Sequence, residues 1–189
     1  IVLVGENGNG KSTLVKLMLG ELEPSNGSVQ RSRGARLALV SQHHAEQLDL
    51  AVTPLEFMLA RFPGDGSYEH EQQLRGHLSQ CGCEAAQQGT RAGALSGGQR
   101  SRVAMAAVSW ERPHLLLMDE PTNNLDLTSV EALAESVKHF EGAVVLVSHD
   151  QHFVSQVAKE VWVVAEGVVK RVESFDAYRA GILAGIKRS

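Results

Sequence analysis

Short apolar runs of strand length recur along the chain. They are IVLV at 1–4, RLALV at 36–40, LLLM at 115–118, AVVLVS at 143–148 and VWVVA at 161–165. Such runs, bounded by turn or polar residues, are typical of buried strands. Helical patterns follow most of them, and strands that alternate with helices indicate a mostly parallel sheet covered by helices on both faces. The pattern therefore predicts an α/β fold.

The strand pattern is absent between about residues 53 and 94, where helical signals replace it. Thr53 and Glu56 have the spacing of a capping box, with Pro54 at the first helical position, so we expect a helix to begin there. Leu74 and Leu78 stand at helical spacing among polar residues. We therefore expect a helical insert on the α/β core.

The length of the chain limits the number of domains. A chain of 189 residues can form one domain with a full core, but it is too short for two ordinary domains. We expect an α/β core from residues 1–50 and 110–173, a helical subdomain from 51–109 and a C-terminal helix over 174–189. Because the chain begins inside an apolar strand without an initiator methionine, we also expect it to be a piece of a longer protein.

Composition and charge argue against several classes of protein. The net charge of −4 argues against a domain that wraps nucleic acid on a basic face. No apolar run approaches the roughly 20 residues that cross a bilayer, so we expect no membrane insertion by this domain. Cys81 and Cys83 are the only cysteines and cannot close a tetrahedral zinc site alone. We expect reduced structural thiols, as in the cytoplasm.

A glycine-rich loop follows the first strand and precedes a helical pattern that ends at Gly20. Residues 5–13, GENGNGKST, match the phosphate-loop pattern Gly-x4-Gly-Lys-Ser. In that pattern backbone N–H groups surround a phosphate, the lysine reaches the β and γ phosphates, and the serine hydroxyl binds Mg²⁺. The alternative is a tight connection between a strand and a helix. We predict nucleotide binding by Gly5, Glu6, Asn7, Gly8, Asn9, Gly10, Lys11, Ser12 and Thr13.

Two acidic residues end the apolar run LLLM. A fully buried strand would deliver Asp119 to the carboxyl edge of the sheet, where a magnesium ion beside the phosphate loop needs an acidic anchor. Glu120, one residue on, could orient or deprotonate a water in line with the γ phosphate. The alternative is a solvated acidic turn. Two adjacent carboxylates at the end of a buried strand repel each other, however, and a turn without a function would gain nothing from this repulsion.

Polar residues also end two other strands. Gln42 follows the second apolar run, and His149 follows the run at 143–148. Judged singly, each is more typical of a polar residue that caps a strand. Because the carboxyl ends of parallel strands meet at one edge, we expect both residues to converge with Lys11 and Glu120 in a site built from several strands.

A second candidate anion site lies in the segment LSGGQ, residues 95–99. Ser96 and Gln99 have the spacing of a capping box, so the sequence predicts a helix that begins at the glycines and runs to about Pro113. Gly97 and Gly98 would expose bare backbone N–H groups at its start, which is where helices bind anions. The chain therefore carries two candidate phosphate sites.

These motifs, in their order, resemble the nucleotide-binding cassette of the ABC ATPases, and the resemblance covers the whole chain. It includes LLLMDEP, and NNLD at 123–126. The resemblance implies a P-loop NTPase fold and pairing of two cassettes head to tail, so that the signature helix of one serves the γ phosphate held by the other. The second cassette would lie in the same chain of the full-length protein or in a homodimer. The helix N-terminus of each cassette would then be stabilised by a γ phosphate that is lost on hydrolysis.

The resemblance also implies the role of each site residue, with ATP as substrate and Mg²⁺ as cofactor. Lys11, Glu120 and His149 would be catalytic, with Glu120 activating the attacking water and His149 contacting the γ phosphate. Mg²⁺ would be held by Ser12, Gln42 and Asp119. The nucleotide of the opposite cassette would be contacted by Ser96, Gly97, Gly98 and Gln99, and Asp126 would belong to the nucleotide-binding set.

Narrower features are similar to the ABC-F subfamily, which is soluble and acts on ribosomes. EPTNNLD is similar to the subfamily's EPTNHLD, and SHDQHFV resembles the second cassette of eukaryotic members. Asn124 replaces the histidine of that subfamily. The resemblance therefore implies the C-terminal cassette of a tandem protein with the ribosome or ribosomal RNA as a partner.

Two other classes of function remain open from the sequence. The chain could be the motor subunit of an ABC membrane transporter, coupled through the helical insert, because such motors are often separate chains. It could also be a nucleotide-gated binding module with little turnover, although Glu120 argues against this. The full-length sequence, showing either a second cassette or transmembrane helices, would discriminate between the first two classes.

Overall fold

The computed structural model describes residues 1–41, 48–123 and 125–186, and the chain forms two compact units. The sheet unit comprises residues 1–41, 114–122 and 143–189. The helical unit comprises residues 42–113 and 123–142.

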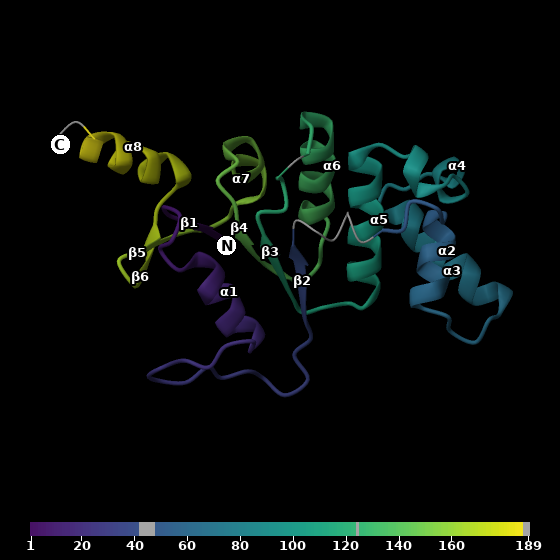
Figure 1. The fold of residues 1–189 in the computed structure, drawn as a ribbon, viewed down its shortest axis with the longest axis horizontal. Coiled ribbons are helices and arrows are strands. Elements are labelled where there is room, and N and C mark those ends of the chain that lie inside the picture. Colours follow the sequence, from purple (N-terminus) through teal and green to yellow (C-terminus); the bar gives the residue numbers. More distant parts are fainter. Residues whose placement is uncertain (42–47, 124, 187–189) are drawn as a thin grey trace. The chain divides into compact units, whose positions relative to one another are not determined.

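A six-stranded sheet forms the centre of the sheet unit, with the order β2-β3-β4-β1-β5-β6 (Figure 1). All neighbouring strands pair in parallel except β5 and β6, which form an antiparallel hairpin through the turn at Glu166 and Gly167. The predicted mostly parallel sheet is therefore confirmed. The strands are β1 (Val2–Val4), β2 (Leu37–Ser41), β3 (Leu115–Asp119), β4 (Ala143–Val147), β5 (Val161–Ala165) and β6 (Val168–Val172).

Both faces of the central strands β1, β3 and β4 are buried, as their apolar runs predict. On one face Leu3, Leu117 and Val145 pack in a cluster with Val15 of α1 (Lys11–Leu19). On the other face the alternate residues Val2, Val4, Leu116, Met118 and Leu146 are at most 3% exposed. Side chains of a strand alternate between the faces, so a run without polar residues indicates burial on both.

Three helices lie in the described part of the sheet unit. The helix α1 ends at Gly20, as predicted, with this glycine in the left-handed conformation. The helix α7 (Gln151–Val157) begins where Asp150 accepts a hydrogen bond from the backbone N–H of Phe153. The third helix, α8, spans Phe175–Ile186.

Two helices of the helical unit begin at the capping residues found in the sequence. The capping boxes of Thr53 with Glu56 and of Ser96 with Gln99 both form. The buried core of this unit includes Met58, Leu74, Leu78, Val103 and Ala106. The helices are α2 (Pro54–Arg61), α3 (Tyr68–Gln80), α4 (Ala85–Gln88), the 3₁₀-helix η1 (Ala92–Ala94), α5 (Gly97–Trp110) and α6 (Leu127–Lys138).

Trp110 packs against that core. The ring of His77 meets it edge-on at 5.2 Å, and Nε2 of His77 lies 3.0 Å from both the carbonyl oxygen of Ala106 and Oγ of Ser109. Burial lowers the pKa of His77 below its usual 6.5, and the hydrogen bond with Ala106 opposes this shift.

Neither described cysteine forms a disulfide. Cys81 is half-buried and Cys83 is buried, and burial raises the pKa of the Cys83 thiol to about 11. No described helix is both long and apolar enough to cross a membrane.

Candidate functional site

The phosphate loop connects β1 to α1 at the carboxyl edge of the sheet. Gly5 has a φ of 148°, and a Cβ atom there would collide with the carbonyl oxygen of Val164 in β5. Gly10 caps α1 with a φ of 93° and gives no side-chain hydrogen bond to the helix. The first-turn N–H groups of α1 therefore have no capping side chain, which favours an anion at this end.

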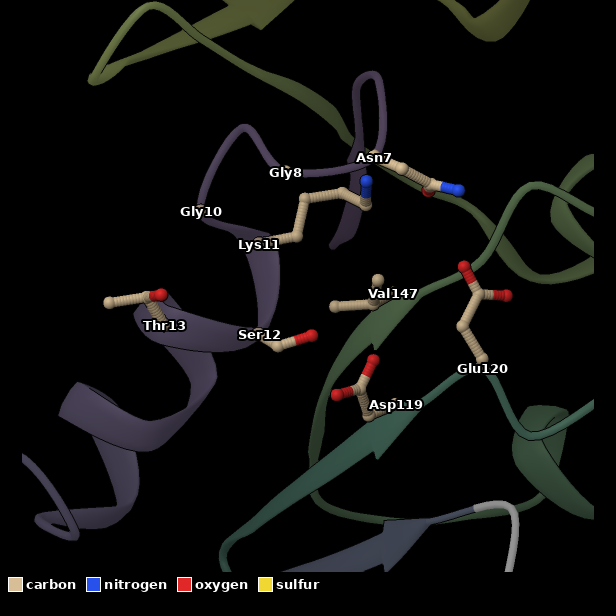
Figure 2. Close-up of a pocket in the computed structure, with 9 residues that line it drawn as sticks. All are labelled: Asn7, Gly8, Gly10, Lys11, Ser12, Thr13, Asp119, Glu120 and Val147. Atoms are coloured by element: carbon tan, nitrogen blue, oxygen red, sulfur yellow. The ribbon is translucent and has the colours of Figure 1, made fainter.

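The side chains at the start of α1 point in different directions (Figure 2). Nζ of Lys11 donates hydrogen bonds to the carbonyl oxygens of Gly5 at 2.8 Å and Glu6 at 3.0 Å. The hydroxyl of Ser12 points toward the carboxylate of Asp119, whereas the side chain of Thr13 points away from it. Lys11 thus lies along its own loop, and Ser12 and Asp119 present oxygen atoms to the same space.

The strand register aligns the ends of the central strands. Asp119, the last residue of β3, pairs with Val147 of β4, and Val147 pairs with Leu3 of β1. A cavity of about 290 Å³ lies at this edge. This volume is at the small end of ligand cavities, so it suits the phosphate end of a nucleotide better than a whole nucleotide. Its lining comprises Asn7, Gly8, Gly10, Lys11, Ser12, Thr13, Asp119, Glu120 and Val147.

Glu120 has an unusual backbone conformation at the end of β3. Its φ is 48°, in the left-handed region, and its N–H donates to the carbonyl oxygen of Val147 at 2.8 Å. A non-glycine residue in this region costs on the order of 1–3 kcal/mol and is found disproportionately at functional sites. The bond to Val147 holds the backbone in this conformation.

The two carboxylate oxygens of Glu120 have different surroundings. Nδ1 of His149 lies 2.9 Å from Oε1. Oε2 is buried and has no hydrogen-bond partner among the described residues. A buried acceptor without a partner is costly, because its lost hydration is not replaced. Oε2 is therefore an unpaired acceptor on a residue that lines the cavity.

The oxygen atoms at this edge fit the predicted magnesium site. Mg²⁺ prefers oxygen ligands, keeps several waters, and is held by one or two carboxylates together with substrate phosphates. Ser12 and Asp119 supply a hydroxyl and a carboxylate, whereas Gln42 lies outside the described residues. Within the parts of the chain that the structure describes, no group of three or more His, Cys, Asp or Glu side chains could hold a metal by itself. The donor set thus suits Mg²⁺ with a phosphate better than zinc.

The remaining predicted site residues lie in the helical unit. Ser96 uses its hydroxyl to accept from the N–H of Gln99 at 3.2 Å, and Oε1 of Gln99 accepts from the N–H of Ser96 at 2.8 Å. This capping box leaves the N–H groups of Gly97 and Gly98 without an intrahelical acceptor. Asp126 is exposed and caps α6, accepting from the N–H of Ser129 at 2.8 Å.

The structure brings most of the predicted phosphate-loop residues together with Asp119 and Glu120 around the cavity. His149 joins this group through Oε1 of Glu120. Val147 also lines the cavity, but it was not predicted from the sequence as a site residue. Its position two residues before His149, at the end of an apolar run, is the signal that could have identified it. Asn124 lies outside the described residues.

The fold and this site define a P-loop nucleoside triphosphatase: a parallel sheet with a glycine-rich loop, a lysine and two acidic residues at its carboxyl edge. The family model described as "ABC transporter" matches residues 1–123. The chain belongs to this family and is an ATPase cassette of it.

The most similar curated relatives include members of subfamily F. The chain is 47% identical over 167 residues to "ABC transporter F family member 3" of Arabidopsis thaliana, covering 88% of this chain and 23% of the relative. It is 45% identical over 181 residues to "ATP-binding cassette sub-family F member 3" of Rattus norvegicus, covering 95% of this chain and 25% of the relative. The chain thus spans about a quarter of the length of these proteins and is similar to one cassette of subfamily F.

Solved structures of ABC cassettes share the fold. The cbiO1 protein from Clostridium perfringens, part of an ABC transporter complex, has a TM-score of 0.77 at 25% identity, covering 94% of this chain and 78% of that protein. A dimeric ATP-binding cassette bound to ADP and phosphate has a TM-score of 0.65 at 22% identity, covering 92% of this chain and 85% of that protein. The predicted α/β P-loop fold is therefore confirmed.

Proposed function

We propose that this chain hydrolyses ATP as one of two paired cassettes in a protein of subfamily F, and that closure of the pair drives an action on the ribosome. The observation that carries the hydrolytic part is the asymmetric carboxylate of Glu120. One oxygen contacts His149, and the other is a buried acceptor that has no partner among the described residues.

Binding of the triphosphate would fall to the phosphate loop. The first-turn N–H groups of α1 and the ammonium of Lys11 would bind the β and γ phosphates, because both are positive donors at the same end of the helix. Ser12, Asp119 and Gln42 are the residues that would hold Mg²⁺. When bound, this ion neutralises negative charge that develops on the phosphate oxygens.

Hydrolysis requires a water in line with the γ phosphate. In our proposal Oε2 of Glu120 accepts a proton from this water while the oxygen of the water bonds to the γ phosphorus. The bond between the γ phosphorus and the oxygen that bridges it to the β phosphate breaks at the same time. The products are ADP and phosphate. His149 would orient Glu120 through Oε1 and contact the γ phosphate, so that the carboxylate keeps one oxygen for the water.

The second anion site would serve the opposite cassette. Gly97 and Gly98 leave two N–H groups free at the N-terminus of α5, and such groups attract a terminal phosphate. Ser96, Gln99 and Asp126 would complete this surface. ATP would then hold two cassettes together until hydrolysis removes the γ phosphate.

The action on ribosomes rests on the similarity to subfamily F and on the sequence features of that subfamily. In this proposal the partners are a second cassette and the ribosome, and the protein acts in the cytoplasm. We also propose that residues 51–109 form the helical subdomain of the cassette.

Sedimentation of the full-length protein with ribosomes tests the proposal. The Glu120→Gln variant, which should bind ATP without turning it over, is expected to pellet with ribosomes in ATP and to stay in the supernatant without nucleotide. The matched control is Glu166→Gln, an exposed glutamate with a similar left-handed backbone, which should pellet as the wild type does. Loss of ATP dependence would contradict the ribosomal role. Recovery of the protein with membranes instead would favour a transporter motor.

A further inference from the structure

Ser129 is a buried serine of the helical unit that no motif assigns to the site. It lies in the first turn of α6 and is 1% exposed. A buried hydroxyl must find a hydrogen-bond partner, so its surroundings indicate what it does. Two segments that are far apart in the sequence both meet it: the turn at Asp126 and the start of α5.

The first contact is with Asp126. The N–H of Ser129 donates to Oδ1 of Asp126 at 2.8 Å. Hydrogen bonds from the Ser129 hydroxyl and then from its N–H hold the pKa of Asp126 below its usual value. Ser129 therefore fixes the exposed carboxylate at the start of α6.

The second contact is with the glycine pair of α5. A Cβ atom at Gly97 would lie 3.2 Å from Oγ of Ser129 and would meet no other atom outside its own helix within 4 Å. A Cβ atom at Gly98 would lie 3.0 Å from Cα of Ser129 and 3.1 Å from Oγ. The glycines are thus required for close packing of α5 on α6 as well as for free N–H groups. At Gly97 the obstacle is a hydroxyl, whereas at Gly98 it is backbone.

We infer that Ser129 is a positioning residue that couples the turn of Ser96–Gln99 to the turn of Asp126. Its N–H bonds to Asp126 on one side, and on the other side its hydroxyl occupies the position that a side chain at Gly97 would need. A displacement of either turn must move this hydroxyl. The two turns therefore shift together, as one surface.

The consequence for activity rests on the proposed function. If both turns serve the nucleotide of the opposite cassette, coupling them ensures that the surface meets that nucleotide as a unit, which preserves the geometry of a preorganised site. The coupling itself is a property of the nucleotide-free protein and can be tested there.

Hydrogen exchange of the full-length protein without nucleotide tests the coupling. Ser129→Ala removes the hydroxyl and should speed exchange about 5- to 10-fold in peptides covering both 97–101 and 126–131, since local opening loses one hydrogen bond and its packing. The matched control is Ser136→Ala, because the hydroxyl of Ser136 bonds only within α6, to the carbonyl oxygen of Ala132 at 2.9 Å. Ser136→Ala should change the exchange rate of neither peptide by more than about twofold. Faster exchange in only one peptide of Ser129→Ala, or in neither, would overturn the inference.

The two glycines provide a second and independent test. Gly97→Ala alone should speed exchange at 126–131, because its Cβ would stand 3.2 Å from Oγ of Ser129 and force this side chain to shift. In the Ser129→Ala background the same change should add nothing, since its one obstacle is gone. Gly98→Ala should speed exchange in both the wild-type and the Ser129→Ala protein, because no side-chain change removes Cα of residue 129. Equal effects of Gly97→Ala in the two backgrounds would contradict the coupling.

ATP turnover of the same variants separates this inference from the proposed function. Ser129→Ala should lower kcat about 5- to 10-fold and leave the KM for ATP within about twofold, because it misplaces groups used in the closed pair and not in uptake of ATP. Conservation of kcat together with faster exchange in both peptides would support the coupling and refute the role of these turns in hydrolysis. Ser136→Ala should keep both constants.

Discussion

Nδ1 of His149 lies 2.9 Å from Oε1 of Glu120, and this contact assigns the two oxygens of one carboxylate to different partners. An ionised carboxylate only accepts hydrogen bonds, so in that state Nδ1 is the donor. Oε2 remains buried and without a partner among the described residues. The left-handed backbone of Glu120, bonded to Val147, fixes this arrangement at the edge of the phosphate cavity.

Glu120→Gln should abolish most turnover without loss of ATP binding. The amide keeps an oxygen for His149, but in place of a basic oxygen it presents an NH₂ group to the water. Turnover of the full-length protein should fall by roughly 10² to 10⁴, as for loss of a general base. Steady-state phosphate release and equilibrium ATP binding measure the two effects. Undiminished turnover would remove Glu120 from this role, and Glu166→Gln, which is not among the residues that line the cavity, serves as the control.

Ser96→Arg should damage hydrolysis at the opposite cassette. The substitution destroys the capping box with Gln99 and places a long side chain at the free N–H groups of Gly97 and Gly98. ATP binding by this chain should remain within about twofold of the wild type, because its phosphate loop is untouched. Nucleotide binding and turnover are measured separately in the parent protein. Abolished ATP uptake by this cassette would contradict the assignment.

Gly5→Ala should destabilise the sheet unit more than Gly8→Ala does. A Cβ at Gly5 collides with the carbonyl oxygen of Val164 on the neighbouring strand, and backbone in a sheet cannot easily move. Gly8 has a positive φ of 87° and open space around it, so its cost is the left-handed strain of about 1–2 kcal/mol alone. Urea unfolding gives both free energies. Equal losses for the two variants would show that the contact with Val164 is unimportant.

His77 should make the protein less stable in mild acid. Burial lowers its folded pKa below 6.5, so the unfolded chain binds the proton more readily. The contribution of His77 to stability is complete above the unfolded pKa of 6.5 and is lost as the pH falls from there toward the folded pKa. His77→Gln keeps a side-chain N–H for Ala106 but does not titrate, so its free energy of unfolding should fall less between about pH 7.5 and about pH 5.5. An identical pH dependence in both proteins would exclude this role.

Local signals made much of the fold predictable from the sequence. Thr53 with Glu56 and Ser96 with Gln99 act within one helical turn, and Gly20 ends α1 by its own backbone freedom, so spacing alone identified them. The convergence of Lys11, Asp119 and Glu120 followed from strand direction. The left-handed backbone of Glu120 and the contact of Ser129 with Gly97 could not be predicted in this way. Both depend on which strand or helix lies alongside, and no periodicity records that.

The central claim is that this chain supplies half of each of two nucleotide sites. A structure of the full-length Glu120→Gln variant closed with ATP and Mg²⁺ tests it most directly. We expect the N–H groups of Gly97 and Gly98 within hydrogen-bond distance of the terminal phosphate of the ATP held by the other cassette. A closed, ATP-bound pair in which these glycines lie far from that phosphate would contradict the account.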